Sequence, residues 1–166
     1  LLGLALTLVT LLSLLSAAGE EIGWRGYLLT RLVEAEVPRP VLVSALLWGA
    51  WHLPLVLSGQ YAAGENRVLS AAVFLVTVVG IGFVIAWMRL STGSVWPAVV
   101  LHGAWNATIQ GAFDTSTKGS SIWVGESGVL VAAAALGAAW LLARRPYAAR
   151  RTPGDEPFVT VPGLSG

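Results

Sequence analysis

The chain has 166 residues, of which 55% are hydrophobic and only 11% are charged, whereas an ordinary soluble domain carries about 25% charged residues. The charged residues are bunched, and long uncharged runs separate the bunches. Because about 20 mostly apolar residues span a bilayer core as a helix, this pattern predicts a polytopic membrane protein. It excludes a soluble enzyme, a secreted disulfide scaffold and a nucleic-acid-binding domain, and the lack of cysteine excludes thiolate catalysis and Cys-ligated metal sites.

The uncharged runs and the connectors between them predict an all-α fold, a transmembrane bundle of about five helices. Pro, Gly, Ser and Thr residues punctuate the connectors, as expected of turns between spans. The first residue is a leucine inside an apolar run, so we expect the chain to be a fragment or to lack upstream helices. The predicted helices cover residues 1–35, 40–57, 68–90, 94–112 and 125–143.

The residues after the last predicted helix differ in composition from the rest. Arginines cluster at residues 144–151, and several prolines and glycines follow among few large apolar side chains. We therefore expect residues 1–143 to form one transmembrane domain and residues 144–166 to be a basic, disordered tail.

The orientation in the membrane is predicted from Lys and Arg alone. If the connector at residues 31–39 is cytoplasmic, most arginines lie on the cytoplasmic side, and only Arg67 and Lys118 lie outside. We therefore expect an integral, multi-pass protein of a bacterial cell membrane with a cytoplasmic C-terminal tail.

Ionisable groups occur deep in three of the predicted helices. At about 1.5 Å per residue, Glu20 lies roughly 20 Å from the cytoplasmic end of its helix, His52 about 18 Å and His102 about 12 Å. Polar groups are expensive at the bilayer centre, and these three come from different helices at overlapping depths. This coincidence favours one functional site over three unrelated features.

The first cluster pairs two charges on one helix. Glu21 and Arg25 are four residues apart and share a helical face, so we expect an ion pair that offsets the cost of both charges. Glu20 points about 100° away from Glu21 on an α-helix and is left free. Such a carboxylate suits the role of a general base.

The other two clusters repeat the four-residue spacing. Trp48 and His52 are placed so that the indole lies against the imidazole, and His102 and Asn106 put a titratable ring beside an amide donor. The second pair is suited to hold a developing oxyanion. The structural alternatives are an ion pair that only orients the helix, and a histidine or Asn106 that only bonds to a neighbouring helix.

Together the clusters resemble the signature motifs of the CPBP family of intramembrane proteases, also called the CAAX prenyl protease or Abi family. They occur in the family's order, each on a separate hydrophobic segment, and the resemblance covers about residues 15–110. A tryptophan stands at position 48 where the family more usually has phenylalanine, which keeps the aromatic face. The three motifs are EExxxR at residues 20–25, an aromatic residue four before a histidine at residues 48–52, and HxxxN at residues 102–106.

The resemblance implies a helical bundle whose conical cavity opens to lipid and to the cytoplasmic side. It implies that Glu20 and His52 activate the water that attacks a peptide carbonyl. It further implies that His102 and Asn106 stabilise the oxyanion. Glu21 and Arg25 would support this site.

Dependence on a metal is left open by the residues. Glu20, His52 and His102 could supply three zinc ligands and leave a fourth position for water. However, the sequence has no HExxH pair, and a ligating Glu20 could not readily act as a free base. We therefore favour a glutamate-dependent mechanism without a cofactor.

The sequence thus predicts an intramembrane endopeptidase whose partners are the lipid bilayer and a membrane-associated peptide or protein substrate. The alternative is a non-enzymatic membrane factor, such as a bacteriocin self-immunity or scaffold protein, that binds a partner in the same polar cavity. A proton-coupled transporter is disfavoured because the helices show no inverted repeat.

Overall fold

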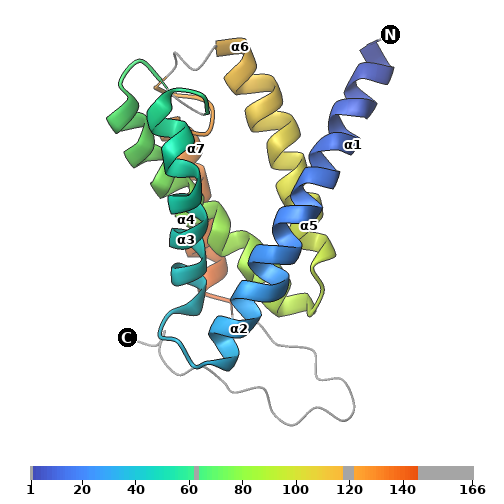
Figure 1. Ribbon diagram of the computed structural model, residues 1–166, viewed down its shortest axis with the longest axis vertical. Helices are drawn as coiled ribbons and strands as arrows, with labels where there is room; N and C mark the ends of the chain where they lie inside the picture. The colour runs from blue at the N-terminus through green and yellow to red at the C-terminus, as the bar shows by residue number, and fades with distance from the viewer. Residues whose placement is uncertain (1, 62–63, 118–121, 146–166) are drawn as a thin grey trace.

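The computed structural model of the protein describes residues 2–61, 64–117 and 122–145. All regular elements in these residues are helical, which confirms the predicted all-α bundle (Figure 1). Where one helical segment runs directly into the next, they form five rods. The predicted disordered tail falls mostly outside the described residues. The segments are α1 (Leu2–Glu21), η1 (Ile22–Leu28), α2 (Leu29–Glu34), α3 (Pro40–Ser58), α4 (Arg67–Thr92), α5 (Trp96–Trp105), η2 (Asn106–Asp114), α6 (Thr115–Thr117) and α7 (Val129–Ala143).

The helix ends follow from local sequence chemistry. Pro40 occupies the first turn of α3, where its missing N–H costs nothing. At the start of α4 the Asn66 side chain accepts a hydrogen bond of 3.0 Å from the Leu69 amide, which is an N-cap. Gly93 ends α4 with a φ of 70°, a left-handed conformation that glycine adopts without steric cost.

Two of the rods contain segments that the sequence did not predict. The seven residues of η1 and the nine residues of η2 are π-helix, a form that occurs mostly as short stretches and frequently at functional sites. Because η2 and α6 continue α5, the fourth rod runs to Thr117, beyond the predicted end at residue 112. The fifth rod starts at Val129 and not at residue 125, because Gly125 has a φ of 92° and the chain turns there.

Helix α4 lies at the centre of one group of helices, packed between α3 and α7. The packing is close where glycines face a neighbour: a Cβ on Gly80 would lie 2.8 Å from the Ala135 backbone on α7. On the α3 side, a Cβ on Gly49 would lie 2.9 Å from a methyl carbon of Leu75 on α4. The buried core of this group includes Trp48, Val56, Phe74, Val78, Ile81, Ile85 and Ala135.

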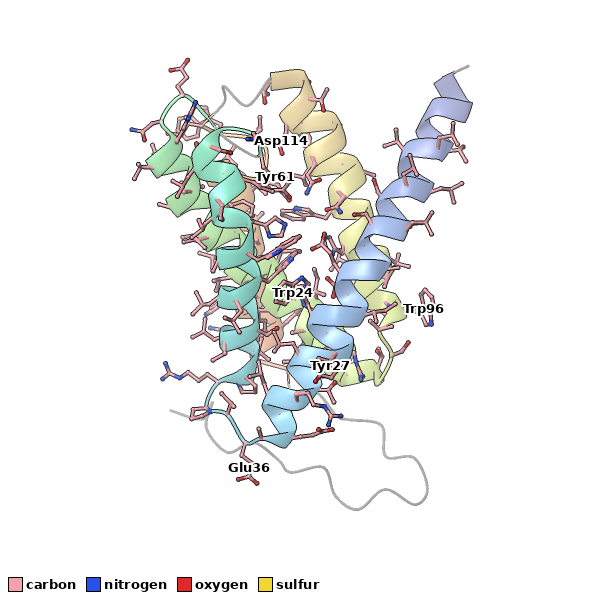
Figure 2. The ribbon with its side chains drawn as sticks, in the orientation of Figure 1. Trp24, Tyr27, Glu36, Tyr61, Trp96 and Asp114 are labelled. Atoms are coloured by element: carbon pink, nitrogen blue, oxygen red, sulfur yellow. The ribbon has the colours of Figure 1, made fainter. Side chains whose placement is uncertain are left out.

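A second pair of rods leans away from this group. Helix α1 packs along α5 and η2, and it meets α3 mainly through η1 and α2. The two groups therefore join near the 35–39 connector and diverge toward the other end of the molecule (Figure 1). Figure 2 places Glu36 at the joined end and Tyr61 and Asp114 at the opposite end.

Large apolar side chains cover much of the outer surface. Leu8, Leu11, Leu12 and Leu15 of α1 are all more than half exposed, an arrangement that suits lipid and is costly in water. The segments Pro40–Ser58 and Arg67–Thr92 are long and apolar enough to cross a membrane. The surface is thus consistent with the predicted membrane bundle.

The expected orientation places one end of the bundle in the cytoplasm. The arginine bias puts the 31–39 connector on the cytoplasmic side, and this connector lies at the joined end of the two groups, so the diverging end would face the opposite side of the membrane (Figure 1). Labelling each end from outside the cell measures this orientation.

The absence of cysteine from the 166 residues makes that measurement direct. Glu36 and Glu65 are exposed and lie at opposite ends of α3. If the arginine bias sets the topology, Glu65 lies outside the cell and Glu36 lies in the cytoplasm. We then expect a maleimide that cannot cross membranes to label Glu65→Cys in intact cells, and to label Glu36→Cys only after permeabilisation. The reverse pattern would contradict the arginine bias and place the diverging end in the cytoplasm.

The contact of α5 with α1 yields a second prediction. A Cβ on Gly103 would lie 2.6 Å from Leu14 Cδ2 and 3.0 Å from Leu14 Cα, so Gly103→Ala should destabilise the fold by about 1–3 kcal/mol through overpacking. Gly137 of α7 has no such neighbour within 4 Å, so Gly137→Ala should stabilise by about 0.5–1 kcal/mol. Thermal unfolding in detergent compares the two, and equal melting temperatures would contradict the packing described.

Candidate active site

A buried carboxylate joins two of the predicted clusters. The Glu21 and Arg25 side chains are 0% and 1% exposed, and Arg25 Nη1 donates to Glu21 Oε1 at 2.7 Å. This confirms the predicted ion pair. The same oxygen lies 2.8 Å from His102 Nδ1, so Glu21 also ties η1 and α1 to α5. The sequence did not predict this link between helices.

Trp48 is the meeting point of the first and second clusters. Its indole Nε1 donates to Glu20 Oε2 at 2.9 Å. The prediction that the Glu20 side chain has no partner was therefore wrong. The Arg25 guanidinium carbon lies 4.1 Å from the centre of the Trp48 ring, which is cation–π geometry. The His102 ring packs edge-on against the same indole, with 5.2 Å between ring centres.

The tautomers of both histidines follow from their partners. The His52 Nδ1 atom lies 3.0 Å from the Trp48 carbonyl oxygen, and because a carbonyl only accepts, Nδ1 carries the proton. The Nδ1 of His102 likewise donates to the Glu21 carboxylate. In the neutral form, each ring therefore keeps the lone pair of Nε2 for another partner.

Aromatic rings surround His52. The predicted contact of Trp48 with His52 is present, edge-on with ring centres 5.8 Å apart. Three further rings pack against the imidazole, at centre distances of 4.7 Å for Trp51, 5.3 Å for Tyr61 and 5.7 Å for Phe74. The ring is therefore fixed from several sides as well as by its hydrogen bond.

The last predicted residue, Asn106, begins the π-helical segment η2 directly after α5. Its Oδ1 atom is buried and has no hydrogen-bond partner among the described residues. The side-chain oxygen of Asn106 therefore makes no hydrogen bond to a neighbouring helix, whereas the structural alternative required Asn106 to make such a bond. A buried carbonyl oxygen without a partner is suited to accept a hydrogen bond from a group that enters the site.

The three candidate zinc ligands, Glu20, His52 and His102, come from separate rods. Among the residues that the structure describes, no three His, Asp or Glu side chains are grouped so as to hold a metal ion. Glu20, His52 and His102 are linked instead through Trp48 and Glu21.

Sequence reasoning missed a second polar cluster at the diverging end of the bundle. Glu126 is 5% exposed, and its carboxylate accepts from Trp105 Nε1 at 2.6 Å and from Gln110 Nε2 at 3.1 Å. Gln110 also donates to the hydroxyl of Tyr61, the ring that packs on His52. In the sequence, the sign of this cluster was Glu126 itself, an acidic residue between two glycines of a connector.

Asp114 in this cluster carries a pH-dependent prediction. Burial, and then the charge of Glu126, raise the pKa of Asp114 from 3.8 to about 7. The folded state therefore binds more protons than the unfolded state between these values, so stability falls as the pH rises through this range. Asp114→Asn keeps an oxygen for the Glu126 amide, whose bond to Asp114 Oδ1 is 3.2 Å. We expect the melting temperature of this variant to fall less than that of the wild type between pH 5 and 8. Equal falls would contradict the raised pKa.

Comparison with known proteins identifies the family. A family model described as Rce1-like, type II CAAX prenyl endopeptidase, matches residues 2–108, and the three motifs lie within this range. A relative named CAAX prenyl protease 2, from Methanococcus maripaludis, is 30% identical over 99 residues, which are 57% of this chain and 36% of that protein. The match thus spans little more than a third of the relative's length. No solved structure matches the chain. By the family match, and in agreement with the resemblance of its motifs, the chain belongs to the Rce1-like family of type II CAAX prenyl endopeptidases.

Proposed function

We propose that this chain is an endopeptidase that hydrolyses a peptide bond in or near the membrane. The observation that carries the proposal is the link between motifs from three rods. Trp48 donates to Glu20, and His102 donates to Glu21, within a family of endopeptidases. A single polar residue in a membrane helix is compatible with several functions. A linked group of side chains that contains a carboxylate, two imidazoles and an amide is suited to hydrolysis.

Water activation is assigned to Glu20 and His52. Glu20 is half-buried and, when ionised, accepts the Trp48 indole N–H at one oxygen, which leaves the other oxygen to take a proton from water. His52 is held through Nδ1 by a neutral carbonyl, so its Nε2 lone pair is a second proton acceptor. Together these groups provide the general base that peptide hydrolysis requires.

Stabilisation of the tetrahedral oxyanion is assigned to His102 and Asn106. His102 donates Nδ1–H to Glu21, so it can donate from Nε2 only as the imidazolium, with Glu21 as its counter-ion. Asn106 supplies amide N–H donors one helical turn further along. Arg25 shares the Glu21 carboxylate with His102 and so positions both the His102 ring and the Trp48 ring. Donors fixed in a site that excludes water stabilise developing charge strongly.

The proposed substrate is a membrane-associated polypeptide, and the proposed location is the bilayer of a bacterial cell membrane. The exposed apolar surface of α1 and α3 supports contact with lipid. The named relative is a CAAX prenyl protease. From it we infer only that the substrate of this chain is a polypeptide bound to the membrane. Prenylated and unprenylated versions of one peptide would test whether the lipid group matters.

The decisive test is Glu20→Gln, which keeps the size of the side chain and an oxygen for Trp48 but removes the base. We expect kcat to fall by about 10²–10⁴-fold while the protein still folds and binds the peptide. Glu34→Gln, which changes an exposed glutamate of α2, is the matched control and should cleave as the wild type does.

Three outcomes of this assay are informative. Unchanged turnover by Glu20→Gln would contradict the assignment of the base. Loss of wild-type cleavage on chelation, with recovery on adding zinc, would overturn the metal-free mechanism. Peptide binding without cleavage by the wild type would favour the non-enzymatic membrane factor.

A further inference from the structure

Glu126 lies in the connector before α7, outside the residues that match the family. The connector is shaped to turn this side chain inward. Gly125 has a φ of 92°, and a Cβ there would overlap the Asp114 carboxylate. The same carboxylate accepts the Glu126 backbone N–H. Glu126 is consequently buried at 5% exposure.

One oxygen of Glu126 holds the start of η2. Oε1 accepts from Trp105, which directly precedes Asn106, and from Gln110, which follows Asn106 by four residues. The donors therefore flank the proposed oxyanion residue on both sides along the chain. Because a π-helix is a rare form of backbone that occurs mostly as single turns, contacts from outside the helix are expected to fix its register here.

The same carboxylate reaches the other half of the site through Gln110 and Tyr61. Gln110 Nε2 donates to the Tyr61 hydroxyl, and the Tyr61 ring lies 5.3 Å from the His52 ring and 5.8 Å from Phe74. Burial, and then the charge of Glu126, raise the pKa of Tyr61, so its hydroxyl stays protonated. Figure 2 shows Tyr61 and Asp114 at the same end of the bundle.

The burial of the Glu126 carboxylate is unfavourable in free energy, and packing alone does not explain why a carboxylate occurs here. Its second oxygen, Oε2, is buried and has no hydrogen-bond partner among the described residues. An apolar side chain of similar size would fill the space without the cost of burying a charge. An acceptor oxygen is needed here because one atom must hold two donors in a fixed arrangement.

We propose that Glu126 is a positioning residue of the site, which fixes Asn106 through Trp105 and Gln110, and fixes His52 through Gln110 and Tyr61. This inference rests on the proposed function. Glu126 itself is assigned no contact with substrate. Its role is to hold the two halves of the site, one on α3 and one on η2, at a constant separation.

The activity test compares Glu126→Ala with Glu126→Gln. Alanine removes the acceptor and should lower kcat by about 100-fold, the effect of a displacement of about 1 Å, with KM within about threefold of the wild type. Glutamine keeps an acceptor oxygen for Trp105 and should recover most of kcat. The control is Ile85→Ala, a substitution of a buried residue that makes none of the hydrogen bonds or ring contacts described above and that also destabilises the fold. It should leave kcat within about threefold.

A second readout does not depend on cleavage. The 166 residues contain two histidines, so the ¹⁵N-histidine spectrum of the solubilised protein can be assigned by replacing each in turn. In Glu126→Ala we expect the His52 ring signals to shift or broaden while the His102 signals, held by Glu21, stay in place. Ile85→Ala should change neither ring.

The proposal is overturned if His52 is unchanged in Glu126→Ala, or if Ile85→Ala alters it equally. It is also overturned if Glu126→Ala cleaves with the kcat of the wild type. If the wild type cleaves no peptide, the proposed function fails, and the histidine spectra still decide whether Glu126 fixes the geometry of His52.

Discussion

The Glu21 carboxylate is the constraint on which the rest of the structure depends. It is fully buried, and one of its oxygens accepts from both Arg25 and His102. Removing a partner from a buried charge costs about 3–5 kcal/mol, because the remaining charge is left uncompensated. The level at which α1 and η1 meet α5 is therefore set by electrostatics as well as by apolar packing. The cation–π contact of Arg25 with Trp48 extends the same constraint to α3.

The two π-helical segments both begin at this level. Ile22 opens η1 directly after Glu21, and Asn106 opens η2 four residues after His102. A π-turn changes which residues share a face, so the helical period of the sequence is broken at the point where the polar side chains converge. Beyond this point the rods carry different contacts, including those of Gln110 with Tyr61 and Glu126. The chain thus departs from regular helix beside the residues proposed for chemistry.

Much of the site was predictable because depth in a membrane can be counted from residue number. The uncharged runs placed Glu20, His52 and His102 at overlapping depths, and the structure joins all three through hydrogen bonds and ring contacts. The spacing of four residues also predicted the Glu21 and Arg25 pair. These predictions needed only the helical period and the cost of burying charge.

The remaining contacts depend on how the helices are rotated about their axes, which one sequence does not determine. The Trp48 indole reaches Glu20, so this residue does more than preserve an aromatic face. Tyr61 and Glu126 lie in connectors, where no periodic pattern indicates which side chain turns inward. The start of α7 was misplaced for the same reason, since the turn at Gly125 depends on Asp114 from the end of η2.

The close contact at Gly103 bears on how relatives of this chain are recognised. A pattern written as HxxxN treats the position after the histidine as open to any residue. In this fold the Leu14 backbone lies against that position, so a large side chain there would move α1 away and take Glu21 with it, out of reach of His102. A search that requires a small residue at this position would pass over sequences that have the motif's letters but cannot assemble its geometry.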